Sequence, residues 1–189
     1  MNLANKITMS RILLIPLFMI AYMWDFPYNE LVACLIFAVA ALTDGVDGYV
    51  ARNYKMVTDF GKFIDPLADK LLVATALICF VGEGEIAAYM AVIIIAREFI
   101  VTGLRTVAMS KGVVIAASMT GKIKTCIQIG AVICVFLFGY NADSPIAARV
   151  ALFGSEYSIG YIAMFVATIF TIYSGIEYLY QNRKLLEDH

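Results

Sequence analysis

The sequence predicts an all-α fold: a polytopic membrane protein with six transmembrane helices and a short N-terminal interfacial helix. Hydrophobic residues make up 62% of the chain and charged residues only 15%, and the mean hydropathy is +0.84. Soluble domains contain roughly 45–50% apolar residues. A chain of 189 residues has room for about six spans of ~20 residues with short connections. We expect residues 1–189 to form one membrane domain with no nucleic-acid partner.

The N-terminal segment combines an amphipathic stretch with an apolar run. Leu3 and Ile7 lie four residues apart, so residues 2–10 predict the short interfacial helix. The apolar run of residues 12–24 is short for a span, but it reaches membrane length if the helix begins near Ile7 and Arg11 extends outward to water. The pattern also resembles a signal peptide. No small-x-small cleavage site follows it and five more apolar segments do, which favours a first span.

Five further apolar segments follow along the chain. Glu30 begins the second, and a Gly-Glu-Gly-Glu turn at residues 82–85 ends the third. The third to sixth spans are expected at about Gly61 to Val81, Ile86 to Ala108, Gly121 to Tyr140 and Tyr157 to Tyr180. Small residues within or beside the last two spans are expected to allow close helix packing rather than to bind a ligand. They are Gly130, Gly139, Gly160 and Gly175.

Loop charges predict the orientation of these spans. One side of the six-span arrangement carries Lys6, Arg11, Arg52, Lys55, Lys62, Arg105, Lys111, Lys122, Lys124, Arg183 and Lys184. The other side carries Asp25, Glu30, Glu83, Glu85, Asp143 and Glu156 with a single basic residue, Arg149. By the positive-inside rule, both termini are expected to be cytoplasmic in a multi-pass protein of the cell membrane.

Four aspartates lie at the predicted cytoplasmic ends of the second and third spans. They are Asp44, Asp47, Asp65 and Asp69, and Gly48 and Gly61 accompany them at helical spacing. The first two aspartates are three residues apart and the last two are four apart, so each pair can share one helix face. Unpaired at the bilayer centre, four carboxylates would cost roughly 10–14 kcal/mol on the insertion scale. Something must offset their charge.

The residues alone leave two ways to offset that charge. Arg52, Lys62 and Lys70 are near enough in sequence to pair with some carboxylates at a partly wet helix end. Alternatively, two divalent cations balance four aspartates, and ligand sets made only of oxygen suit Mg²⁺ or Mn²⁺. Salt bridges leave the two glycines unexplained, whereas paired metals are the usual clamp for displacement at phosphorus. The only histidine is the last residue, so imidazole metal sites are excluded.

The aspartate stretch resembles the signature of the CDP-alcohol phosphatidyltransferases at every fixed position. The matching residues are Asp44, Asp47, Gly48, Ala51, Arg52, Gly61, Asp65 and Asp69, with eight residues between Arg52 and Gly61. The resemblance implies a homodimer of six-span subunits that transfers a phosphatidyl or phospho-alcohol group from a CDP-linked donor to an alcohol and releases CMP. It implies that Asp44, Asp47 and Asp65 bind two metal ions, and that Asp69 is both a ligand and the general base. It also implies that a CDP site is lined by Gly48, Ala51, Arg52 and Gly61.

The acceptor alcohol must be inferred from other parts of the chain. Residues 96–105 (AREFIVTGLR) and 121–125 (GKIKT) resemble bacterial members of the family that join CDP-diacylglycerol to glycerol 3-phosphate. Arg105, Lys122 and Lys124 are predicted on the cytoplasmic side, where they could bind the phosphate of that acceptor. Alternatively, they only mark the cytoplasmic face and attract anionic membrane lipid. Arg97 and Glu98 lie deeper and either are structural or orient the site.

Two rival functions remain open. A transferase of the same family could use another acceptor, such as inositol phosphate or serine. A cation or proton transporter could use intramembrane carboxylates to bind the transported ion. The sequence argues against a transporter, because the aspartates lie on one membrane side and no acidic residue continues a path through the external half of the spans.

Overall fold

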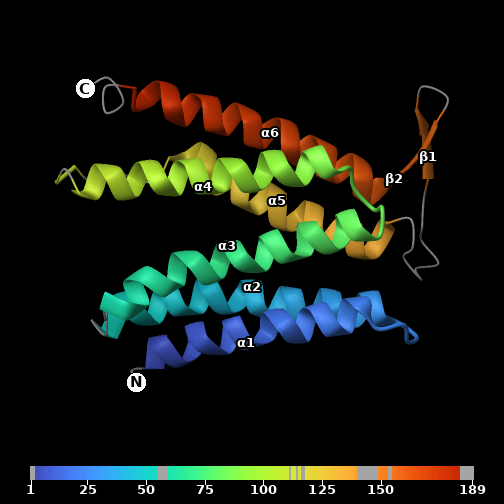
Figure 1. The fold of residues 1–189 in the computed structure, drawn as a ribbon, viewed down its shortest axis with the longest axis horizontal. Coiled ribbons are helices and arrows are strands. Elements are labelled where there is room, and N and C mark those ends of the chain that lie inside the picture. The colour runs from blue at the N-terminus through green and yellow to red at the C-terminus, as the bar shows by residue number, and fades with distance from the viewer. Residues whose placement is uncertain are drawn as a thin grey trace.

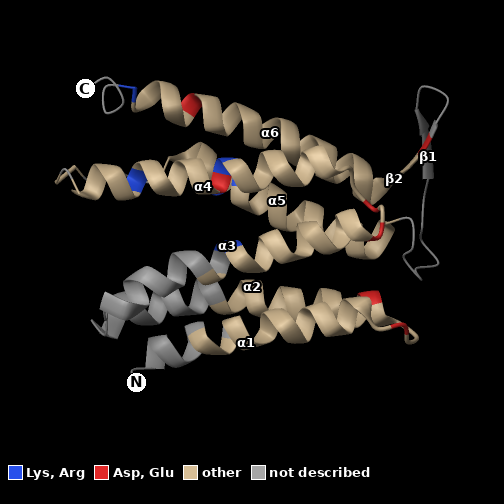
Figure 2. Ribbon diagram, in the orientation of Figure 1, with Lys and Arg blue, Asp and Glu red and all other residues tan. Residues whose placement is uncertain are grey.

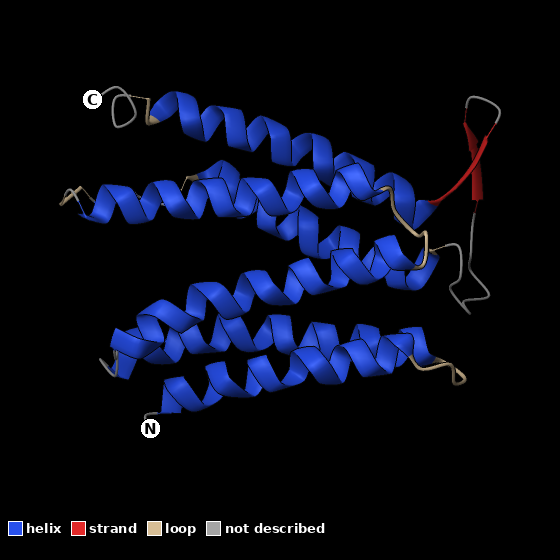
Figure 3. Cartoon of the chain, viewed as in Figure 1, coloured by secondary structure: helices blue, strands red, loops and turns tan. Residues whose placement is uncertain are grey.

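A computed structural model of the protein describes six helices and one β-hairpin. It describes the backbone of residues 3–54, 59–110, 112–113, 115, 118–139, 149–152 and 155–183, and their side chains except those of 3–8, 11, 44–54, 59–67, 69, 149–152 and 155. The helices are α1 (Leu3–Met23), α2 (Asn29–Tyr54), α3 (Asp59–Gly82), α4 (Ala88–Ser110), α5 (Met119–Phe138) and α6 (Ile159–Gln181) (Figures 1 and 3). The predicted all-α character is therefore confirmed for most of the described chain.

Two elements differ from the sequence expectation. The separate interfacial helix predicted for residues 2–10 is wrong, because α1 runs without a break from Leu3 to Met23. No glycine or proline precedes Pro16 in this segment, and each further residue adds a hydrogen bond to a helix that has already formed. The second difference is a short antiparallel hairpin before α6, formed by β1 (Arg149–Leu152) and β2 (Ser155–Ser158).

The helices pack as two groups of three that meet side by side (Figure 1). Helix α1 packs on α2 and α3, whereas α6 packs on α4 and α5. Contacts of α5 with α2 and of α3 with α4 join the two groups. Consecutive helices run in opposite directions, so the α1–α2 and α3–α4 turns lie at one end of the bundle with the hairpin. The start of α1, the end of α2, the start of α3 and the end of α6 lie at the other end.

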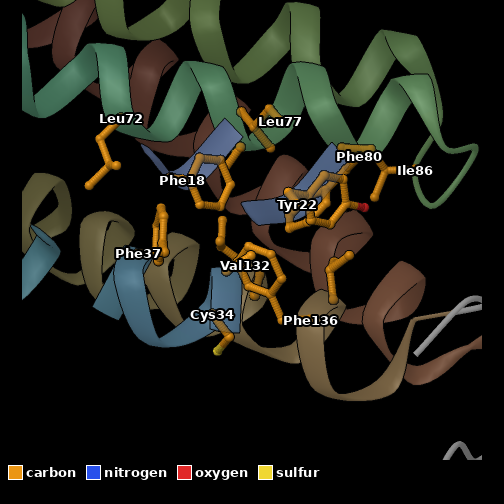
Figure 4. Close-up of a cluster of buried hydrophobic side chains, with 14 of the residues drawn as sticks. Phe18, Tyr22, Cys34, Phe37, Leu72, Leu77, Phe80, Ile86, Val132 and Phe136 are labelled. Carbon is orange, nitrogen blue, oxygen red and sulfur yellow. The ribbon is translucent and has the colours of Figure 1, made fainter. Parts of the chain in front are cut away.

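Aromatic side chains hold the two groups together near the hairpin end. Phe136 of α5 lies edge-on to Phe80 of α3, with ring centroids 4.8 Å apart, and to Phe18 of α1, at 5.9 Å (Figure 4). Tyr22 also meets Phe136 edge-on, and Phe37 of α2 packs beside it. Each such ring pair contributes about 0.5–1.5 kcal/mol beyond its area burial. One residue of α5 therefore fastens three helices of the other group.

The outward faces of the bundle are apolar. Large side chains that are more than 60% exposed include Leu13, Leu42, Ile78, Val92 and Ile176. Apolar surface of this extent is unusual on soluble monomers and indicates a lipid environment. Among the described residues, α5 and α6 are long and apolar enough to cross a membrane. Shorter apolar helical stretches occur at Ile12–Met23, Asn29–Thr43 and Lys70–Gly82, so the number of spans stays a prediction.

Charged residues are distributed unevenly along the bundle. Among the described residues, most acidic ones lie at the hairpin end, apart from Glu98 of α4 and Glu177 of α6, and the basic ones lie in the middle and at the opposite end (Figure 2). The acidic residues at the hairpin end belong to the turns and helix starts predicted on the external side, such as Glu30 and Glu83. The ends of the folded bundle therefore match the two sides that the loop charges separate.

Substitution of Gly160 by Ala is expected to destabilise the contact between α5 and α6. A Cβ atom there would lie 2.7 Å from Val135 Cα and 3.0 Å from the Cys134 carbonyl oxygen, so backbone must move. We expect a loss of about 1–3 kcal/mol in unfolding free energy, measured by thermal unfolding in detergent. Gly130→Ala is the control, because a Cβ there meets no atom within 4 Å and Ala favours helix by up to ~1 kcal/mol. Equal melting temperatures for the two variants would contradict the close packing.

Candidate active site

The four aspartates lie where α2 ends and α3 begins. Asp44 is ten residues before the end of α2, and Asp69 is ten residues after the start of α3. Asp47 is seven residues before the end of α2 and Asp65 six residues after the start of α3. At ~1.5 Å per residue, the aspartates therefore stand at two matched levels, about 10 and 15 Å from the helix ends. Residues 55–58 join these antiparallel helices.

The chemistry of these positions fits divalent cations. All four carry carboxylates, and Mg²⁺ and Mn²⁺ prefer oxygen ligands. The side chains of the four aspartates lie outside the described ones, as do those of the predicted CDP-binding residues Gly48, Ala51, Arg52 and Gly61. The backbone supports the predicted pairing of α2 with α3, and the ligand roles stay predictions.

A second polar group lies in the interior, between α4 and α5. Lys124 of α5 is 2% exposed and forms an ion pair with Glu98 of α4. Nη1 of Arg97 lies 3.5 Å from the same Glu98 oxygen. Lys70 of α3, the neighbour of Asp69, lines a cavity of about 10 Å³ with Glu98 and Gln128. This interior group therefore lies next to the segment of α3 that carries the aspartates.

Helix α6 supplies hydrogen-bond acceptors for two arginines of α4. Nη2 of Arg97 donates to Oγ of Ser174 at 2.7 Å. Nε of Arg105 donates to the Tyr178 hydroxyl at 3.1 Å, and its guanidinium carbon lies 5.5 Å from the centre of that ring. Nε of Arg97 is buried and has no hydrogen-bond partner in the described part of the chain.

The structure separates the three cations predicted to bind the acceptor phosphate. Arg105 turns toward α6, and Lys124 turns toward α4. Lys122 precedes the buried Lys124 by two residues, which correspond to about 200° of rotation around an α-helix. Lys122 therefore lies on the opposite face of α5 and is exposed. Arg97 and Glu98, whose role the sequence left open, lie at the centre of the interior group. Charged residues inside an apolar span are the sequence signal that points to them.

The six described helices form a bundle with apolar outer faces, and two of these helices carry the aspartate pairs. The chain belongs to the CDP-alcohol phosphatidyltransferase family, because the model of that family matches residues 1–173. The resemblance of the aspartate stretch to the family signature is thereby confirmed at the level of the whole chain.

Curated relatives match this chain along most of their length. A Bacillus subtilis (strain 168) protein named CDP-diacylglycerol--glycerol-3-phosphate 3-phosphatidyltransferase is 43% identical over 98% of this chain and 97% of its own. A Rickettsia bellii (strain RML369-C) protein of the same name is 33% identical over 97% and 96%. A Mycobacterium tuberculosis (strain CDC 1551 / Oshkosh) protein named probable phosphatidylglycerophosphate synthase is 35% identical over 94% and 80%.

Substitution of Glu98 by Gln is expected to destabilise the protein, because Lys124 and Arg97 then lose a buried countercharge. Breaking such a pair costs up to about 3–5 kcal/mol. The double variant Glu98→Leu/Lys124→Met removes the Lys124 charge together with its partner, so it is expected to recover part of that loss in thermal unfolding, while Arg97 still lacks the carboxylate. The exposed Asp25 supplies the control, since Asp25→Asn should change stability by less than about 0.5 kcal/mol. A double variant no more stable than Glu98→Gln would refute the pairing.

Proposed function

We propose that the protein transfers the phosphatidyl group of CDP-diacylglycerol to glycerol 3-phosphate, giving phosphatidylglycerophosphate and CMP. The observation that carries this proposal is the 43% identity, over 98% of the chain, to a relative named for that reaction. The family membership and the aspartate signature support the transfer chemistry. On this proposal the protein is a phosphatidylglycerophosphate synthase of phospholipid biosynthesis.

The residues of α2 and α3 would bind the metal ions, accept a proton and bind the CDP group. Asp44, Asp47 and Asp65, with Asp69, would hold two Mg²⁺ or Mn²⁺ ions, which when bound supply positive charge that stabilises the diphosphate and its leaving group. Asp69 accepts the proton of the acceptor hydroxyl. That oxygen attacks the phosphorus that carries the lipid, and the bond to the CMP oxygen breaks. Beside the aspartates, the CDP group is bound by Gly48, Ala51, Arg52 and Gly61.

The cations of α4 and α5 would bind the phosphate of the acceptor. Arg105 uses only Nε for Tyr178, so its two terminal nitrogens can face two oxygens of one phosphate. Lys124 and Arg97 both contact the carboxylate of Glu98, which places these two cations beside each other in the interior. Lys122 is exposed and would attract the dianion at the entrance. Serine lacks a phosphate and would leave these cations without a ligand.

The same proposal includes the membrane arrangement. Six spans in the cell membrane, with both termini and the aspartates on the cytoplasmic side, place the site where nucleotides and glycerol 3-phosphate occur. The apolar outer faces and the uneven charges of the two bundle ends support it. A homodimer is expected from the family resemblance alone.

An assay of the purified protein tests the reaction. CDP-diacylglycerol, Mg²⁺ and one acceptor at a time (glycerol 3-phosphate, inositol phosphate or serine) are supplied, and CMP is measured. We expect CMP with glycerol 3-phosphate only, and none from the control variant Asp69→Asn, which lacks the base. If CMP forms only with serine or only with inositol phosphate, that alcohol is the acceptor and glycerol 3-phosphate is not. If no acceptor gives CMP, the transferase proposal is overturned.

Substitution of Arg105 by Ala is expected to raise the KM for glycerol 3-phosphate about 10–100-fold, the value of one or two charge-assisted hydrogen bonds. The KM for CDP-diacylglycerol should change less than twofold. Steady-state CMP release measures both constants. Arg183→Ala is the matched control, because this exposed arginine lies over the Tyr180 ring much as Arg105 lies over Tyr178. Equal rises in both KM values would count against a phosphate-binding role.

A further inference from the structure

Two buried hydroxyl groups of α6 contact arginines of α4. We propose that Ser174 and Tyr178 are positioning residues that hold Arg97 and Arg105 in place for the acceptor phosphate. This inference rests on the proposed function, because it assigns a role to residues beside the proposed phosphate-binding arginines.

The geometry of α6 favours this role. Ser174 and Tyr178 lie four residues apart, which places them on one helix face, and they are 0% and 2% exposed. Each accepts a hydrogen bond from a different arginine of α4, which packs against α6. A Cβ atom at Gly175 would lie 3.1 Å from Cγ of Arg97. Helix α6 therefore contacts both the head group and the aliphatic stem of that arginine.

The chemistry of the two hydroxyl groups also favours the positioning role. A free arginine side chain loses about 2 kcal/mol of rotamer entropy when it is immobilised by a ligand. A hydrogen bond to a fixed hydroxyl group orders the side chain beforehand, so part of that cost is absent from ligand binding. A hydroxyl has no charge, so it orients a guanidinium without neutralising it, unlike a carboxylate. The Tyr178 hydroxyl bonds to Nε of Arg105 and leaves the terminal nitrogens for the phosphate oxygens.

Two other hydroxyls on α6 show that burial alone does not require this arrangement. Thr168 and Thr171 are 3% and 0% exposed. Their hydroxyls donate to carbonyl oxygens of their own helix, those of Met164 at 2.8 Å and Ala167 at 2.7 Å. These threonines satisfy their polar atoms locally, whereas Ser174 and Tyr178 contact charged side chains of another helix. Thr171 therefore offers a matched control for Ser174.

The variant Tyr178→Phe tests the proposal, because it keeps the ring under Arg105 and removes only the hydroxyl. We expect the KM for glycerol 3-phosphate to rise about 3–10-fold with the KM for CDP-diacylglycerol unchanged, and the melting temperature to fall by no more than about 2–4 °C, the value of one hydrogen bond. Ser174→Ala should behave likewise. The controls Tyr180→Phe, at a residue 68% exposed, and Thr171→Val should leave both KM values unchanged.

A double variant separates positioning from a general structural role. If Tyr178 acts through Arg105, adding Tyr178→Phe to Arg105→Ala should raise the KM for glycerol 3-phosphate no further, because coupled residues are not additive. Additive effects of the two substitutions would overturn the inference. So would a Tyr178→Phe variant that leaves the KM for glycerol 3-phosphate unchanged, or one that raises both KM values and lowers the melting temperature. Failure of the proposed function is distinct: the wild type then releases no CMP with glycerol 3-phosphate.

Discussion

The burial of charge inside an apolar helix bundle is the constraint on which the rest of the structure depends. Each charged side chain at the centre of a span costs about 2.5–3.5 kcal/mol on the insertion scale unless it finds a partner. In the described interior those partners come from other helices: Glu98 of α4 pairs with Lys124 of α5, and two hydroxyls of α6 accept hydrogen bonds from Arg97 and Arg105. The same contacts that offset the charge therefore fix the relative positions of α4, α5 and α6.

The two groups of helices divide the proposed work. The helices α2 and α3 carry the aspartates, whereas α4, α5 and α6 carry the cations and their partners. Phe136 of α5 packs on rings of α1 and α3, and the cavity between Lys70, Glu98 and Gln128 lies where α3 meets α4 and α5. The packing of α5 and α4 on the first group therefore sets how far the cations of the second group lie from the aspartates.

Much of the fold could be predicted from hydropathy, because each span is a local property of about twenty residues. The third span was expected from Gly61 to Val81, and α3 runs from Asp59 to Gly82. The hairpin before α6 was missed, although Gly154 between two short segments is a turn signal. The interfacial helix was wrong because amphipathic spacing over residues 2–10 does not show where a helix ends, and no glycine or proline follows them before Pro16.

By itself the sequence determined the spacing of the aspartates and glycines and, through that signature, the family of the chain. These are features of single helices and their periodicity, and they can be read along the chain. Only the tertiary structure decided that Lys124 turns inward while Lys122 stays exposed, and that Arg97 meets Ser174, 77 residues away. The physical reason is that helical spacing places a side chain on a face, whereas the helix that this face meets depends on packing between segments distant in sequence.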